Sequence, residues 1–311
     1  MIQWVENKMA HIITVIWPLF FLIFLGFLLK RNHIFSSEFW SGTEKLNYFI
    51  LFPALLIYGL SVAPLEDSRL FSLYLGIFFI IGIASVVLVF FKVLLKWPIN
   101  RFGVYIQGML RFNTYLGLAI TSNIFGSEGI INAALMIAIM VPLCNIVSVL
   151  SFISSKSNLS FKGLAIPIIK NPLILACVIG IFINITHIGL PFGLDQILKH
   201  LSSASLPLGL ICIGASLQIS TLRMEKKGIL FNCIGRLLIM PLIAFLIAIV
   251  LGLKTLEIQL LVLFFAIPTA PTAYILTRQL NGDSQLMAGI ITLQTILAII
   301  TLPIVLMVFM N

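Results

Sequence analysis

The stretch FFAIPTAPTAYILTRQLNGD, residues 264–283, is an apolar run that is interrupted by Pro268 and Pro271 and carries threonines around the interruption. A proline inside a helix removes one hydrogen-bond donor and collides with the carbonyl one turn earlier, at a cost of about 3 kcal/mol or more. Lipid supplies no water to the freed backbone groups, so such a break persists only where protein, hydroxyl groups or a wet cavity satisfies them. We therefore expect a broken membrane helix with a binding site at the break; a simple kink is the alternative.

The composition around this stretch is that of an integral membrane protein. The 311 residues are 60% hydrophobic and 9% charged, and the mean hydropathy is +1.16. Soluble domains are roughly 45–50% apolar and about 25% charged. Segments of about 20 apolar residues suit a hydrocarbon core of ~30 Å. Ten spans are predicted, near residues 11–29, 44–62, 70–91, 103–125, 130–152, 172–190, 201–219, 229–251, 256–280 and 285–309.

The basic residues behind the formal charge of +9 lie mainly in the loops between spans, and this distribution does not indicate a nucleic-acid-binding surface. In alternate loops, thirteen Lys and Arg residues fall on one side of the membrane and four on the other. The positive-inside rule places the richer side in the cytoplasm and both termini outside. The sequence thus predicts a multi-pass protein of the cell membrane, in contact with the lipid bilayer and without a nucleic-acid partner.

The two halves of the chain resemble each other. Alignment of Gly126 with Gly282 also lays Asn113 on Thr269, and a long apolar helix follows each glycine. Each half has five spans, an odd number, so the second half enters the membrane from the opposite side. Inverted repeats of this kind are typical of secondary transporters. The predicted fold class is an all-α membrane protein, with residues 1–155 and 156–311 as two inverted five-helix repeats; chance likeness of membrane helices is the alternative.

The repeat predicts a second break within GMLRFNTYLGLAITSNIFG, residues 108–126. Here Asn113 and Thr114 stand where Thr269 and Ala270 stand in the other half. This segment has no proline, so a continuous helix whose polar residues face a neighbour is the alternative. In inverted-repeat transporters, broken helices at equivalent positions cross near the midplane and direct half-helix ends at the substrate.

Two arginines lie inside predicted spans. A charged side chain in the bilayer is costly and usually faces the protein interior. Arg111 is a candidate for binding a carboxylate through its guanidinium fork, because no Asp or Glu falls clearly inside a span. A structural role, or snorkelling toward the cytoplasm, is the equal alternative for Arg111. For Arg236 we expect a structural role, because it lies nearer its loop.

Further polar residues inside spans, including Asn145, Gln294 and Thr295, are expected near the crossing point, although contact between helices is the commoner role of such residues. The sequence has no metal-ligand spacing, nucleophile triad or phosphate loop, so neither an enzyme nor a cofactor is predicted. The candidate substrate-binding residues are Arg111, Asn113, Thr114, Asn145, Pro268, Thr269, Ala270, Pro271, Gln294 and Thr295.

At these residues the chain resembles the auxin efflux carrier family, which includes bacterial malate permease-like proteins and plant PIN-type exporters. The likeness lies in RFNTYLGLAI at 111–120, GSEGIINAALMIAIMVPLCNIVSV at 126–149 and AIPTAPTAYILTRQLNGDSQLMAGIITLQTILAIITLPIV at 266–305, with LNYFILFPALLIYGL at 46–60 and KNPLILACVIGIFIN at 170–184 agreeing in position. Each motif alone is loose, but their order and spacing together are specific.

The resemblance implies a fold similar to bile-acid symporters and sodium/proton antiporters, with crossed, broken fourth and ninth helices that bind organic anions. It also implies an elevator-like mobile bundle on a scaffold of helices one, two, six and seven, and frequent homodimers. Phe112 and Ala119 stand where relatives have proline. The long cytoplasmic loop of plant exporters is missing, which weakens auxin itself as the substrate.

The sequence therefore favours a secondary carrier of a small organic anion, such as a malate- or auxin-like carboxylate. Export is favoured over uptake, because an anion leaving a cell with a negative interior gains ~2.3 kcal/mol per charge per 100 mV. Sodium-coupled uptake of the anion is one alternative. A membrane sensor that binds the ligand without transporting it is the other.

Overall fold

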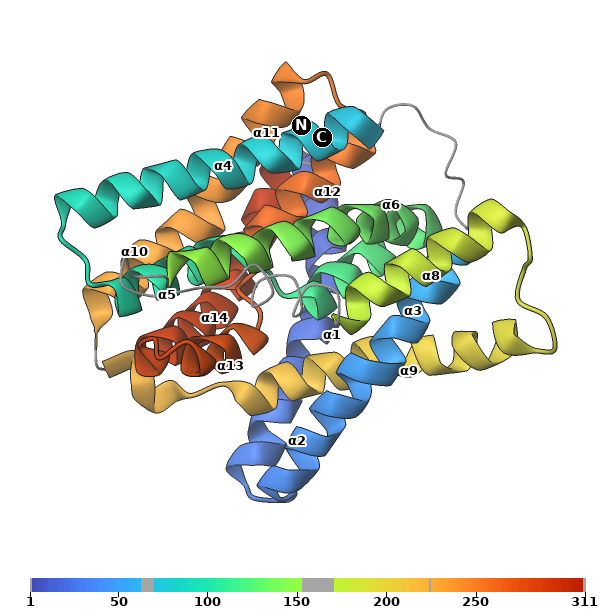
Figure 1. The fold of residues 1–311 in the computed structure, drawn as a ribbon, viewed down its shortest axis with the longest axis horizontal. Helices are drawn as coiled ribbons and strands as arrows, with labels where there is room; N and C mark the ends of the chain where they lie inside the picture. Colours follow the sequence, from blue (N-terminus) through green and yellow to red (C-terminus); the bar gives the residue numbers. More distant parts are fainter. Residues whose placement is uncertain (1, 63–69, 153–170, 224, 310–311) are drawn as a thin grey trace.

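Proline and glycine positions set the ends and the bends of the helices. The computed structural model describes residues 2–62, 70–152, 171–223 and 225–309, and every regular element within these ranges is helical. The α-helices are α1 (Ile2–Arg31), α2 (Ser37–Leu46), α3 (Phe52–Ser61), α4 (Leu70–Leu94), α5 (Ile99–Leu110), α6 (Thr114–Ser151), α8 (Pro172–Thr186), α9 (Leu194–Ser216), α10 (Lys226–Ile234), α11 (Met240–Val250), α12 (Thr255–Ala266), α13 (Thr272–Gln279) and α14 (Ser284–Phe309) (Figure 1). Three short turns complete them: η1 (Asn47–Leu51), η2 (Ile219–Arg223) and η3 (Gly235–Ile239).

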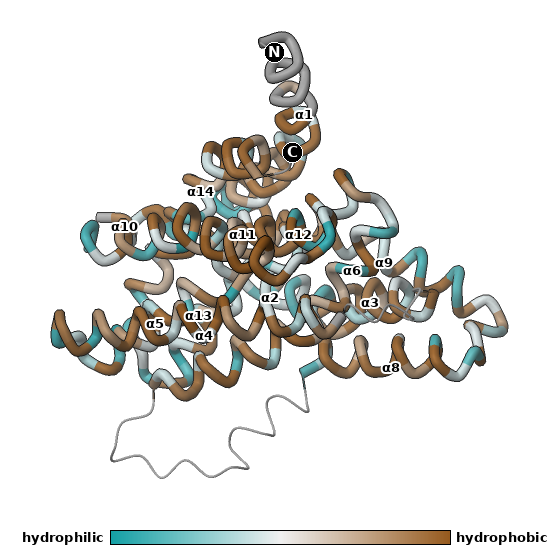
Figure 2. Tube along the Cα trace, turned by 90° about the horizontal axis from the view of Figure 1, so that it is seen from above, coloured by the Kyte–Doolittle hydropathy of each residue, from teal (hydrophilic) through white to brown (hydrophobic). Residues whose placement is uncertain are grey.

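Each predicted span coincides with one helix or with consecutive helical segments. Six helical stretches in the described ranges are long and apolar enough to cross a membrane, and α8 and α12 are shorter apolar helices. Figure 2 shows hydrophobic residues along most of α8 and α11. The chain is thus an all-helical, multi-pass membrane protein. The predicted boundary between the two repeats, at residues 155 and 156, lies outside the described residues.

Gly126 divides α6 into two parts. Its φ of 61° and ψ of −146° are not helical, and glycine adopts a positive φ at little cost because it has no Cβ. The part of α6 before Gly126 continues the fourth predicted span, and the part after it forms the fifth. The predicted end of the fourth span, at residue 125, agrees with this position.

Two π-helical turns interrupt the second and eighth spans. The turn η1 ends just before Pro53, and η3 ends just before Pro241. In each turn a backbone N–H reaches five residues back, from Phe52 to the Asn47 carbonyl and from Met240 to the Gly235 carbonyl. Such π-bulges occur as single turns within helices and are frequent at functional sites.

The helices α1, α3, α8 and α9 pack on one another as one group, which we call the α1–α9 group. Gly26 of α1 faces the Ile211 carbonyl of α9, and Gly214 of α9 faces the Ile23 carbonyl of α1, so a Cβ at either glycine would collide with backbone. The helices α4, α5, α10, α11, α12 and α14 pack mainly on one another, and α6 contacts both groups. Figure 1 shows α6 crossing the centre of the molecule, with α4 above it and α9 below it.

Candidate functional site

Both predicted breaks are present, and they meet. Helix α5 ends at Leu110 and α6 begins at Thr114, whereas α12 ends at Ala266 and α13 begins at Thr272. The segment between each pair is extended, with φ and ψ of −71° and 145° at Arg111 and of −73° and 152° at Ile267. The backbone N–H of Asn113 donates to the Pro268 carbonyl at 2.9 Å. The first break thus forms without a proline of its own.

The helices that precede the two breaks have equivalent bounds in the two halves of the chain. Gly126 and Gly282 differ by 156 positions (282 minus 126). The same difference relates Ile99–Leu110 of α5 to Thr255–Ala266 of α12. The residues before these helices, Pro98 and Lys254, share a φ of −67° and a ψ of 154°.

Arg236 supplies the hydrogen bonds that the breaks remove from the helices. Its side chain is fully buried and donates to the carbonyls of Met109 at 2.8 Å, Phe264 at 2.7 Å and Ile267 at 2.9 Å. In continuous helices these carbonyls would accept from residues 113, 268 and 271, each four positions later. Residues 268 and 271 are prolines and have no N–H, and the N–H of residue 113 is diverted to Pro268. The structural role expected for Arg236 therefore fits its contacts.

A second set of contacts satisfies the Gly108 carbonyl, near the end of α5. Thr269 Oγ1 donates to it at 2.7 Å, and Gln294 Nε2 donates at 3.0 Å. Gln294 Oε1 in turn accepts from the Thr269 N–H at 2.8 Å, and its Nε2 also donates to Asn232 at 2.9 Å. These groups are all buried. They hold the two breaks together at the centre of the protein.

The amino-terminal ends of α6 and α13 face two small hollows beside the crossing. The first hollow, of about 50 Å³, is lined by Asn113, Tyr115 and Pro271, among others. The second, also about 50 Å³, includes Arg111 and Asn145 in its lining. Thr114, Ala270 and Thr272 line both of them. A helix amino terminus carries unsatisfied N–H groups and partial positive charge, which favour an anion.

Asn113, which lines the first hollow, has a side-chain amide donor without a partner among the described residues. Its side-chain oxygen accepts from the Leu116 N–H at 3.2 Å and so caps α6. The residue is 1% exposed, and its Nδ2 has no hydrogen-bond partner among the described residues. A buried amide without a partner is costly, so a ligand that accepts a hydrogen bond here would relieve the cost.

A larger cavity of about 500 Å³ adjoins these hollows. Arg111, Asn145 and Thr272 line it on one side, and Glu44, Lys45 and Tyr48 line it from α2 and η1. We call it the arginine cavity. Arg111 is half-buried, and its Nη2 donates to Thr272 Oγ1 at 3.1 Å. The contact holds the guanidinium at the start of α13 and leaves its other donors available to a ligand.

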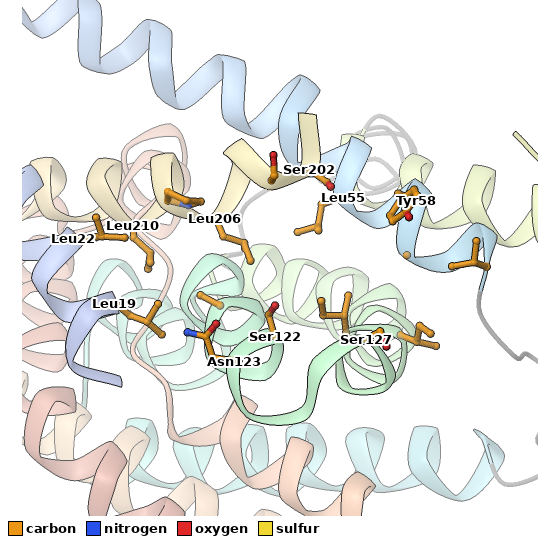
Figure 3. A pocket seen from close by; sticks show the side chains of 17 residues that line it. Leu19, Leu22, Leu55, Tyr58, Ser122, Asn123, Ser127, Ser202, Leu206 and Leu210 are labelled. Atoms are coloured by element: carbon orange, nitrogen blue, oxygen red, sulfur yellow. The ribbon is translucent and has the colours of Figure 1, made fainter. Parts of the chain in front are cut away.

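Another cavity, of about 430 Å³, is lined by residues of α1, α3, α6 and α9. Its polar lining comes from Ser122, Asn123 and Ser127 of α6 and from Ser202 and Ser203 of α9, and we call it the serine cavity. Figure 3 shows that the Ser122 and Asn123 side chains approach it from α6, opposite leucines of the α1–α9 group. No charged residue lines it within the described parts of the chain.

A narrow contact separates the serine cavity from the crossing. The rings of Phe52 and Tyr115 meet edge to face, with centroids 4.7 Å apart and an interplanar angle of 87°. Gly209 of α9 lies against the Tyr115 ring, and a Cβ there would come within 2.8 Å of it. Phe52, Tyr115 and Gly209 line the first hollow, whereas the serine cavity is lined by later residues of α3 and α6 and by residues on both sides of Gly209 in α9. We call these three residues the aromatic contact.

The candidate residues divide into two sets. Arg111, Asn113, Thr114, Asn145, Ala270 and Pro271 line the hollows or the arginine cavity. Four others do not line these spaces: Pro268 accepts from Asn113, Thr269 and Gln294 join the breaks, and Thr295 donates to the Ile291 carbonyl of its own helix at 2.7 Å. These four residues support the backbone around the site but do not line its cavities.

Several residues that line the site are absent from the sequence-based prediction. Glu44 stands at the end of a predicted span and is not among the predicted site residues, yet it lines both the first hollow and the arginine cavity. Tyr48, Asn171 and Thr272 also line the arginine cavity. The proximity of Thr272 to Pro271 is a signal for that residue. Glu44 gives no comparable signal, because α2 is far from the crossing in sequence.

Comparison with known proteins agrees with this architecture. Residues 155–306 match the sequence model of a family described as membrane transport protein. Over 291 residues the chain is 28% identical to a protein of Methanothermobacter thermautotrophicus (strain Delta H) named an uncharacterized transporter, and the alignment covers 91% of this chain and 93% of that protein. The resemblance inferred from the sequence is thereby confirmed, and the matching family is one of transporters rather than enzymes.

Proposed function

Because its second half matches a family of membrane transport proteins, we propose that this chain is a secondary carrier of a small organic anion. One observation carries the proposal: the amino-terminal ends of α6 and α13, together with Arg111, converge on the two hollows, and Asn113, whose Nδ2 has no hydrogen-bond partner among the described residues, lines the first of them. Each of these groups favours a carboxylate, through N–H donors, partial positive charge or a guanidinium fork.

The cavities support an alternating-access mechanism. Both cavities lie between α6 and the α2–η1–α3 span: the arginine cavity is lined by α2 and η1, and the serine cavity by α3 and also by α9. The aromatic contact joins α3, α6 and α9 at the first hollow. The helices that flank the two breaks are α5, α6, α12 and α13. A shift of these helices along the α1–α9 group would open one cavity to the site as the other closes. Such an elevator-type motion moves the bound anion without moving the hydrogen bonds that join the two breaks.

The electrical driving force favours export of a cargo that carries net negative charge. An anion leaving a cell with a negative interior gains ~2.3 kcal/mol per charge per 100 mV. We therefore propose export as the main direction for such a cargo.

Counterflow of a labelled carboxylate in proteoliposomes tests the carrier function. A thermal-shift screen of the purified protein against mono- and dicarboxylates, including malate and indole-3-acetate, first selects the acid that stabilises it most. We expect the labelled form of that acid to accumulate transiently in vesicles preloaded with the unlabelled acid. A sensor would bind the acid without counterflow, and sodium-coupled uptake would lose its transport when sodium is removed; either result would contradict the proposal.

A further inference from the structure

Glu44 is the carboxylate of the proposed site. It lies in the last turns of α2, is half-buried, and lines both the first hollow and the arginine cavity. No other Asp or Glu in the described ranges lines the hollows or this cavity. Within those ranges, the Glu44 carboxylate has no side-chain hydrogen bond and no ion pair. An acidic group without a partner therefore faces the space in which an organic anion would bind.

The charged and titratable groups that line these spaces with Glu44 come from α2, η1, the first break, α6 and α9. Lys45 is on the same helix, Tyr48 is in η1 and Arg111 is in the first break. Tyr115 of α6 and Cys212 of α9 line the first hollow with it, and Cys144 of α6 lines the second. Two of these groups are cations at neutral pH, and Glu44 is the anion among them.

An anionic cargo and an ionised Glu44 oppose each other in one cavity. Like charges within a partly buried site repel more strongly than in water, because the effective dielectric constant is lower. A carboxylate close to a second carboxylate is therefore driven toward its protonated form. The protonated side chain is neutral, so it neither repels the anionic cargo nor competes with it for the Arg111 guanidinium.

We propose that Glu44 takes up one proton when the organic anion binds and releases it when the anion leaves, so that the affinity for the anion depends on the pH of the solution that reaches the arginine cavity. The inference rests on the carrier function proposed above. In the binding step, ionised Glu44, one proton from water and the free anion become protonated Glu44 and bound anion. When the anion leaves the site, the reverse step returns the proton to water.

The proton does not cross the membrane with the cargo. Glu44 lies on α2, which packs on η1 and α9, and it lines the arginine cavity but not the serine cavity. Its proton therefore returns to the side of the membrane that the arginine cavity faces. Glu44 thus makes the carrier sensitive to pH without changing the charge that crosses with the cargo.

Calorimetric titration of the full-length purified protein with malate and with indole-3-acetate, between roughly pH 6 and 9, tests the inference. Carboxylic acids of this kind are predominantly ionised in that range. We expect the affinity of the wild type to fall toward tenfold per pH unit at the alkaline end, because ionised Glu44 repels the ligand. In Glu44→Gln the affinity should stay at its acidic-side value throughout. Titration in two buffers of different protonation enthalpy should show the uptake of up to one proton per ligand by the wild type and of none by Glu44→Gln.

Glu38→Gln is the matched control, because Glu38 lies on the same helix, is exposed and lines none of these spaces. It should behave as the wild type does. The Cys212→Ala variant tests whether the Cys212 thiol, rather than the Glu44 carboxylate, gives the affinity its pH dependence. Loss of that pH dependence in Cys212→Ala alone would overturn the proposal. A flat wild-type profile, or an equal slope in Glu44→Gln, would also overturn it.

Transport provides a second readout. In proteoliposomes, the initial rate of malate counterflow at a low malate concentration should fall for the wild type as the pH rises from roughly 6 to 9, whereas the rate for Glu44→Gln should stay constant. An equal pH dependence of the rate in both proteins would reject the proton-binding role of Glu44 while the carrier function stands. If the wild type neither binds nor exchanges either acid, the carrier function and this inference fall together.

Discussion

Arg236 Nη2 donates to the Phe264 carbonyl at 2.7 Å, the carbonyl that residue 268 would bond in a continuous helix if it were not proline. The same guanidinium serves the Ile267 carbonyl, which Pro271 cannot reach, and the Met109 carbonyl of the other break. One buried side chain thus replaces three main-chain donors. Both breaks depend on it, which couples the two halves of the protein at their centre.

Replacement of Arg236 by methionine should destabilise the whole protein. Each buried carbonyl left without a donor costs about 1–3 kcal/mol, and three are affected. We expect the midpoint of thermal unfolding to fall by more than about 5 °C, with a lower yield of folded protein. Arg101→Gln is the control, because the ion pairs of Arg101 with Glu225 and Asp283 are partly exposed and such pairs contribute about 0–1 kcal/mol. Equal effects of the two variants would contradict this role of Arg236.

Substitution of both prolines by alanine should close the second break. The new N–H groups at 268 and 271 can bond to the Phe264 and Ile267 carbonyls and so compete with Arg236. We expect Pro268→Ala with Pro271→Ala to keep its expression but to lose at least about tenfold in the rate of counterflow, because a continuous helix withdraws the amino terminus of α13 from the cargo. The initial rate of counterflow measures this. Normal rates in the double variant would remove the crossover from the mechanism.

Arg111→Gln should weaken the binding of carboxylates without unfolding the protein. A hydrogen bond to a charged group contributes about 1.5–3 kcal/mol, so the dissociation constant should rise roughly tenfold to a hundredfold. Titration calorimetry measures the affinity, and thermal unfolding monitors the fold. Lys45→Gln removes a cation from the same cavity but away from the breaks, and it should have a smaller effect. Unchanged affinity together with a lower yield would assign a structural role to Arg111.

Gly209→Ala should slow the exchange between the two access states. The added Cβ would lie within 2.8 Å of the Tyr115 ring and 2.9 Å of Asn47 Nδ2, so it wedges the aromatic contact. We expect a several-fold lower rate of counterflow with little change in affinity. Gly42→Ala is the matched control, because Gly42 lies in α2 and a Cβ added there would meet no atom within 4 Å among the described residues. Equal rates in both variants would show that the aromatic contact does not limit transport.

Local sequence was sufficient for several features of this protein. Hydropathy located the membrane spans, because an apolar segment in lipid must satisfy its backbone within one helix. Pro268 and Pro271 located the second break, because no neighbouring residue can restore their missing N–H groups. The first break was inferred only from its likeness to the second. The structure shows why it exists without proline: the Asn113 N–H bonds to Pro268 instead of continuing its own helix.

The sequence by itself determined the membrane class, the positions of the spans and the second interruption, because these depend on hydropathy and on the backbone chemistry of single residues. Only the tertiary structure decided which polar residues face the cavities and which join the helices. Thr269 and Gln294 are turned inward to Gly108, whereas Glu44, 67 residues before Arg111 in the chain (111 minus 44), shares a cavity with it. Contacts between distant segments depend on how whole helices pack, and a residue's local neighbours do not encode that packing.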